Sequence, residues 1–75
     1  DSDELLPKAV EVILENNKAS ASMLQRRLRI GYNRAARMID QMEELGFIGK
    51  YENGKPREVL ITEEQWKKYF AERGV

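Results

Sequence analysis

The chain has 75 residues, no cysteine, no histidine and a formal net charge of zero from 13 basic and 13 acidic side chains. This length suits a single domain, residues 1–75, near the lower limit for one apolar core. The composition excludes disulfides and thiolate chemistry, leaves almost no ligands for zinc or iron, and argues against an enzyme, so neither a metal nor a cofactor is expected.

Two helices are predicted in the first third of the chain. The first runs over residues 4–16, where acidic residues precede an apolar stripe at helical spacing. That stripe consists of Leu6, Ala9, Val10 and Ile13. The second helix is short, over residues 22–28, and the pattern Ser22-x-x-Gln25 predicts a capping box at its start.

A third helix is predicted over residues 32–45, between two glycines. Gly31 is expected to permit the sharp turn before it, and Gly46 is a typical C-terminal signal. The buried face is predicted to hold Tyr32, Ala35, Ile39 and Met42. The opposite face carries Asn33, Arg37, Asp40 and Glu44 at helical spacing.

The period then changes, and residues 47–61 are predicted to form a small β-hairpin. Two β-prone runs flank Asn53-Gly54, a strong hairpin signal. Pro56 cannot donate to a ladder, so the second strand is expected to begin at Arg57 or to be an edge there.

A C-terminal helix is predicted over residues 62–73, with Thr62-x-x-Gln65 as a second capping box. Its apolar stripe consists of Trp66, Tyr69 and Phe70. We expect this stripe to close the core, and the alternative is a docking surface for a partner.

Charge is unevenly distributed in spite of the zero balance. Residues 16–39 contain no acid but six bases: Lys18, Arg26, Arg27, Arg29, Arg34 and Arg37. The alternative reading is an ordinary solvated face, but a long acid-free window favours a binding site for a polyanion.

This order of elements predicts a mainly α fold with a small β-hairpin: a winged helix-turn-helix with a three-helix core, a wing and an extra C-terminal helix. Residues 22–45 would be the helix-turn-helix and residues 47–61 the wing. In that arrangement the first residues of the second helix enter the DNA major groove. Asn33, Arg34 and Arg37 would then lack internal partners because nucleic acid supplies them.

The expected contacts divide by role. Arg37 suits guanine, Asn33 suits adenine, and Asp40 suits a cytosine amino group or buttresses Arg37. A surface ion pair between Arg37 and Asp40 is the alternative. Phosphate contacts are expected from the remaining cations: Arg26, Arg27, Arg29, Arg34, Lys50, Lys55 and Arg57.

The run "ASASMLQRRLRIGYNRAARMIDQMEELGFIG", followed by "KPREVL", resembles the C-terminal gamma domain of the FtsK/SpoIIIE family of DNA translocases. The resemblance implies a non-catalytic winged-helix module of a hexameric, ATP-driven motor. It also implies reading of short, G-rich, polar chromosomal sequences by positions matching Asn33, Arg37 and Asp40, which orients the motor during cell division or sporulation. Some family members carry Glu where Asp40 stands.

The expected partners are double-stranded DNA and the parent motor, with no small-molecule substrate. A site-specific recombinase is a further partner of FtsK-type but not SpoIIIE-type members, and the residues do not separate the two types, although "SMLQRR" and "KPREVL" lean toward SpoIIIE. No apolar run nears the ~20 residues that cross a bilayer. The expected location is the cytoplasmic face of a membrane-anchored translocase at the septum.

Two other functions remain open. An autonomous winged-helix transcriptional repressor would need a dimer, with the C-terminal aromatic helix as its interface. A protein-binding adaptor without a nucleic-acid role is disfavoured by the acid-free window. The isolated domain is expected to be a monomer that binds DNA weakly.

Overall fold

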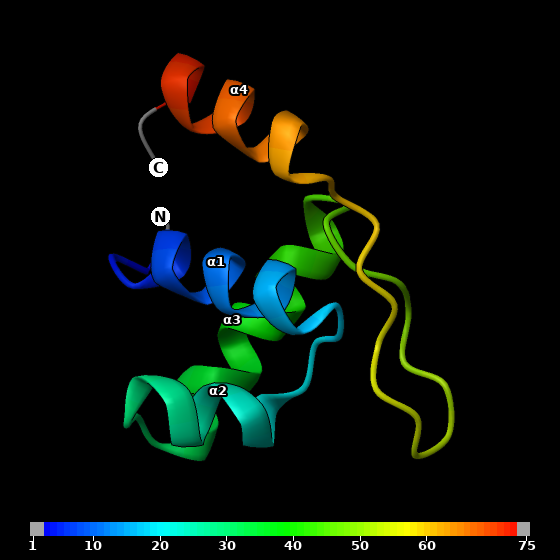
Figure 1. The fold of residues 1–75 in the computed structure, drawn as a ribbon. Helices are drawn as coiled ribbons and strands as arrows, with labels where there is room; N and C mark the ends of the chain where they lie inside the picture. The colour runs from blue at the N-terminus through cyan, green and yellow to red at the C-terminus, as the bar shows by residue number, and fades with distance from the viewer. Residues whose placement is uncertain (1–2, 74–75) are drawn as a thin grey trace.

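The structure is a computed structural model that describes residues 3–73, and this part of the chain is mainly helical with little β-structure. Its helices are α1 (Leu6–Asn16), α2 (Ala21–Leu28), α3 (Tyr32–Glu44) and α4 (Glu63–Arg73). α1 lies between α2 and α4 in Figure 1, α3 crosses behind it, and the segment between α3 and α4 extends to one side.

The core forms where α1, α2 and α3 meet. Leu6, Ala9, Val10 and Ile13 of α1 are all completely buried, as the helical period predicts. They pack in one cluster with Leu24, Met38, Met42, Ile48 and others from the following elements. Burying each large apolar side chain contributes roughly 1.5–3 kcal/mol, so this cluster holds the three helices together.

The start of α2 differs by one residue from the sequence prediction. Its N-cap is Ser20, whose hydroxyl accepts a hydrogen bond from the Met23 amide at 3.1 Å. The prediction that Ser22 caps this helix is therefore wrong. Ser20 has extended backbone angles, which an N-cap needs, whereas Ser22 is already inside the helix.

The two turns beside α3 use different residues to reverse the chain. Before α3 the left-handed residue is Arg29, at φ 56°, whereas Gly31 has φ −75° and ψ 165°, which any residue adopts. Gly31 is thus not the residue that permits this turn. After α3, Gly46 has φ 80°, its amide donates to the Glu43 carbonyl, and the Phe47 amide donates to the Met42 carbonyl. This Schellman motif confirms Gly46 as the end signal.

The segment after α3 folds back on itself through isolated bridges. Ile48 pairs with Val59, and Glu52 pairs with Lys55 across the turn at Asn53-Gly54. Arg57 pairs instead with Ala19, the residue between α1 and α2, through reciprocal backbone hydrogen bonds of 3.0 and 3.1 Å. The connection from α1 to α2 therefore anchors the base of this segment, which we call the hairpin (residues 47–61).

α4 begins with the predicted capping box. The Thr62 hydroxyl accepts from the Gln65 amide at 3.1 Å, and the Gln65 side chain accepts from the Thr62 amide at 3.0 Å. Trp66 is buried and meets the edge of Phe47, with ring centroids 6.0 Å apart, so it closes the core as predicted. Phe70 stays 41% exposed. No helix within residues 3–73 has both the length and the apolar character to span a membrane.

Candidate nucleic-acid interface

One stripe of α3 presents three polar side chains to solvent. Asn33, Arg37 and Asp40 are all exposed, at the spacing that puts them on one helix face. Within residues 3–73, none of the three makes a side-chain hydrogen bond or an ion pair. The alternative of an Arg37–Asp40 surface pair is therefore not what this structure contains. The stripe combines donors and an acceptor that take part in no side-chain hydrogen bond or ion pair with the described residues, although the charge of Arg37 acts on Asp3.

Tyr32 stands beside this stripe at the first position of α3. It is 60% exposed, so the prediction that it packs in the core is wrong. The apolar period of α3 starts one turn later, at the completely buried Ala35. Tyr32 falls on the first turn, beyond the edge of the cluster, so its hydroxyl and ring face outward.

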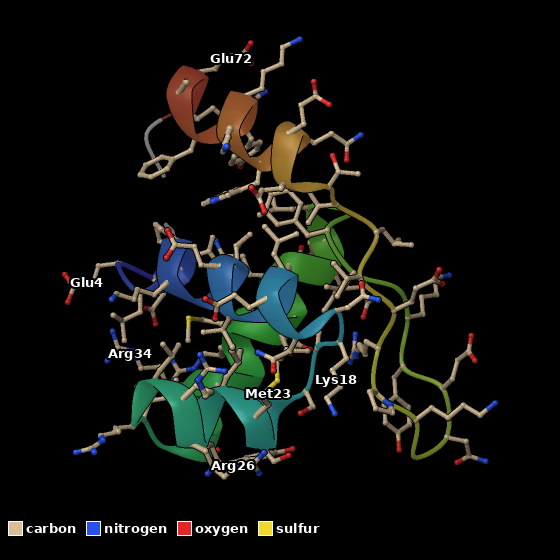
Figure 2. All side chains as sticks on the ribbon, in the orientation of Figure 1. Glu4, Lys18, Met23, Arg26, Arg34 and Glu72 are labelled. Atoms are coloured by element: carbon tan, nitrogen blue, oxygen red, sulfur yellow. The ribbon has the colours of Figure 1, made fainter. Side chains whose placement is uncertain are left out.

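α2 contributes arginines of two kinds. Arg26 and Arg29 are exposed and form no ion pair with any residue from 3 to 73. Arg27 instead binds Glu15 of α1 at 3.0 Å, with 48% of the arginine side chain exposed. Figure 2 shows Arg26 on α2 and Glu72 on α4 at opposite ends of the molecule. Arg26, from the acid-free stretch of the sequence, thus lies far from α4.

Arg34 has an acidic partner that the sequence prediction missed. Asp3 accepts two hydrogen bonds from its guanidinium, both 2.8 Å long, and also one from the Leu5 amide at 2.8 Å. Figure 2 shows Arg34 at the same edge of the molecule as Glu4, beside the turn that leads into α1. The expectation that Arg34 lacks an internal partner is therefore wrong.

This contact changes the acidity of Asp3. The Arg34 hydrogen bonds lower the pKa of the Asp3 carboxyl from 3.8 to about 2, with a smaller contribution from the charge of Arg37. The same pair raises the pKa of Arg34. The Asp3 side chain is 19% exposed, so the pair is partly shielded from water and fastens the start of α1 to α3.

The hairpin cations also differ from one another. Lys50 and Lys55 are exposed, as phosphate contacts would require. Arg57 is only 14% exposed at its side chain, forms an ion pair with Glu43 of α3, and lies over the Tyr51 ring at 5.9 Å. Arg57 thus fixes the hairpin against α3. Its guanidinium offers less surface to a ligand than the two lysines do.

A groove of about 490 Å³ separates α3 from the hairpin. Its walls include Ser20 and Ser22 at the start of α2, Tyr32 and Asp40 of α3, and Tyr51 of the hairpin. The Tyr51 hydroxyl accepts from the Gly54 amide at 3.2 Å, which fixes the ring at the hairpin turn. Sequence reasoning did not name Tyr51 as a site residue. Its position between two hairpin lysines was the available signal.

Comparison with known proteins identifies the family of this chain. Residues 1–62 match the family described as the Ftsk gamma domain. The chain belongs to the FtsK gamma-domain family. The match takes in α1, α2, α3 and the hairpin, whereas α4 lies beyond it.

Several named proteins contain a similar gamma domain. The DNA translocase SpoIIIE of Bacillus subtilis (strain 168) is 60% identical over 65 residues, which are 87% of this chain and 8% of that protein. The DNA translocase FtsK of Caldanaerobacter subterraneus subsp. tengcongensis is 51% identical over 75 residues, 100% of this chain and 11% of that protein. The DNA translocase FtsK of Halalkalibacterium halodurans is 63% identical over 59 residues, 79% of this chain and 8% of that protein. The chain therefore spans about a tenth of the length of these curated relatives.

Proposed function

We propose that this gamma domain is a non-catalytic, sequence-specific reader of double-stranded DNA, and that it uses its fold as a winged helix. Its targets would be short, G-rich, polar chromosomal sequences. Reading them would orient a hexameric translocase, anchored at the septal membrane, during cell division or sporulation. The single observation that carries the proposal is the exposed stripe of Asn33, Arg37 and Asp40, which has no partner within residues 3–73.

The physical argument starts from the shape of α3. A helix fits the major groove, where each base pair presents a distinct set of donors and acceptors. The Arg37 guanidinium matches O6 and N7 of guanine, the Asn33 amide matches N6 and N7 of adenine, and the Asp40 carboxylate accepts from a cytosine amino group. These roles need side chains that the protein itself leaves unsatisfied, and this is the state of all three.

Phosphate contacts would come from both sides of α3. Arg26 of α2 and Arg29 just after it, with Lys50 and Lys55 of the hairpin, are exposed and have no acidic partner within residues 3–73. Arg27, Arg34 and Arg57 stay in the proposed phosphate set, but each already holds a carboxylate. Phosphate would have to compete for them, so we expect the unpaired cations to supply most of the salt dependence.

A monomer is proposed for the isolated chain. The repressor alternative needs a dimer surface on α4, but Trp66 is buried and Tyr69 meets the edge of Phe47 at 5.2 Å between centroids. Most of the aromatic stripe is thus used inside the molecule. Sedimentation at tens of micromolar tests this proposal, an order-of-magnitude choice for detecting modest self-association, and a stable dimer would favour the repressor.

The test of DNA reading is a variant pair on two duplexes. First, duplexes that bind the chain are selected from a random pool. Arg37→Ala should then weaken binding to the selected duplex by about 1–3 kcal/mol and binding to a scrambled duplex far less. The matched control, Arg26→Ala, should weaken both equally and reduce the salt slope by about one phosphate contact.

Equal losses on the two duplexes for Arg37→Ala would contradict base reading by that residue. Failure of the unaltered chain to bind any duplex at low salt would instead contradict the whole proposal and favour the adaptor alternative. Contact with a recombinase is proposed only for an FtsK-type parent, and adding that protein to the DNA complex would test it.

A further inference from the structure

A second hollow lies away from α2, between α1 and α4. Its volume is about 670 Å³, which lies within the usual range of ligand-binding pockets in proteins. In Figure 1, α4 is on the other side of α1 from α2. Residues 63–73 form one wall, and they follow the part of the chain that matches the gamma-domain family. The hollow is therefore lined by other residues than the exposed stripe of α3, and α4 forms one of its walls.

The floor of this hollow is apolar and accessible. Leu14 of α1 is half-buried, and Phe70 of α4 is 41% exposed. Phe70 stacks on the buried Trp66 with ring centroids 5.4 Å apart and planes at 23°, so Trp66 supports the exposed ring from within. A large ring left in contact with water beside a concave apolar surface is typical of an interaction site.

The rim of the hollow is acidic. The charged residues that line it are three carboxylates and one ammonium: Glu11, Glu15, Glu63 and Lys67. Lys67 is 3.7 Å from Glu63, and Glu15 binds Arg27 outside the hollow. Glu11 forms no ion pair with any residue from 3 to 73. Glu11 is thus the rim carboxylate that remains for a cationic partner, and the exposed Glu63 is held only by a long contact.

We propose that this hollow is a docking site for a basic amphipathic helix of a partner protein. Apolar side chains spaced i and i+4 on that helix cover Leu14 and Phe70, and flanking lysine or arginine side chains pair with Glu11 and Glu63. This is the helix-in-groove mode of recognition, with apolar anchors for affinity and charges for specificity. Because α1 separates the hollow from α2, one molecule can hold DNA and this partner together.

The chain carries its own reporter for the test, because Trp66 is its single tryptophan and lines the hollow. The probe is a short helical peptide of leucine and lysine without aromatic residues, titrated against the whole 75-residue chain. We expect a saturable change in Trp66 fluorescence, and amide shifts confined to α1 and α4. The counterpart peptide of leucine and glutamate should bind at least about tenfold more weakly because it meets the same carboxylates.

Matched variants separate a docking site from general charge attraction. Glu11→Lys should weaken the leucine–lysine peptide about tenfold, whereas Glu64→Lys, on an exposed residue outside the hollow, should change it less than about twofold. Phe70→Ser should weaken it about tenfold, and Leu60→Ser, on an exposed hairpin residue, should not.

Five results would overturn the proposal, and four of them concern the peptides and the variants. These are equal binding of the two peptides, equal effects of the two glutamate variants, amide shifts on α2 and α3 instead of α1 and α4, and no fluorescence change at millimolar peptide. Self-association that the leucine–lysine peptide competes away would also overturn it, because the occupant would then be a second copy of the chain. Binding of duplex is measured separately, so failure here leaves the proposed DNA reading intact.

Discussion

The α2–α3 face and the α1–α4 end of this molecule differ in the charges that they expose. The first presents arginines and the second mainly carboxylates. On the first, Arg26, Arg29 and Arg37 stand without a carboxylate partner within residues 3–73. On the second, carboxylates outnumber cations around an apolar hollow. A zero net charge therefore conceals two surfaces of opposite sign, each suited to a different class of ligand.

The comparison also separates cations that serve the fold from cations that remain for a ligand. Arg34 and Arg27 lie in the same acid-free stretch as Arg37, yet folding brings Asp3 to the first and Glu15 to the second. Both carboxylates come from the region of α1. These two carboxylates thus pair with Arg34 and Arg27, whereas Arg26, Arg29 and Arg37 form no ion pair within residues 3–73.

The largest expected effect on stability comes from removing the Trp66 side chain, which packs α4 against the core. Trp66→Ala should lower the free energy of unfolding by about 3 kcal/mol, because it deletes a buried ring and its contacts with Phe47. Urea unfolding measures this loss. Duplex affinity of the folded fraction should stay within about twofold of the original, an order-of-magnitude margin. A comparable loss of DNA binding would show that the two ends are not independent.

A smaller effect is expected from the turns on either side of α3. Gly46→Ala should lower the free energy of unfolding by about 1 kcal/mol, because φ 80° disfavours a side chain. Gly31→Ser is the matched control. Gly31 is the N-cap of α3 in an extended conformation with open space around it, so serine should raise stability by a few tenths of a kcal/mol. Thermal unfolding of the two variants should shift in opposite directions, and equal shifts would contradict this assignment of the turns.

The smallest effect concerns the link between the two regions. The pKa of Asp3 is lowered from 3.8 to about 2, so the stabilisation is present above pH 3.8 and is lost as the pH falls toward 2. With solvent screening we expect about 1 kcal/mol or less from this group. Asp3→Asn should remove that part of the pH dependence, which urea unfolding at pH 5 and pH 2.5 would measure. An unchanged pH profile in the variant would contradict the contribution of this pair.

Local patterns in the sequence predicted much of the fold. The apolar period placed the α1 residues Leu6 to Ile13 in the core, and the pairs Thr62–Gln65 and Glu43–Gly46 mark helix ends through contacts within four residues. Signals of this kind need no knowledge of tertiary structure. At these two helix ends the donor and the acceptor are close in the chain, whereas the similar pattern Ser22-x-x-Gln25 gave the wrong cap for α2.

Two of the failures, at Arg34 and Tyr32, have the opposite cause. Arg34 meets Asp3 from 31 residues away, a contact that no local pattern records. Tyr32 fits the period of α3 but lies one turn outside the cluster that the other elements build, so its exposure depends on tertiary packing. The left-handed residue Arg29 was missed because a glycine two positions later offered a simpler explanation. The candidate stripe of Asn33, Arg37 and Asp40 has the exposure that its spacing predicted, and its role in DNA reading stays a prediction.

The positions of the start of α1 and the end of α4 have a practical consequence for engineering the chain. In Figure 1 the start of α1 and the end of α4 lie on the same flank, away from the hairpin. A spacer that joins the end of one copy to the start of the next would therefore not need to pass across the hairpin. Such a fusion raises the effective concentration of the second unit once the first has landed. Because both helix ends lie on one flank, the chain is also a candidate for circular permutation, with new ends at an exposed loop.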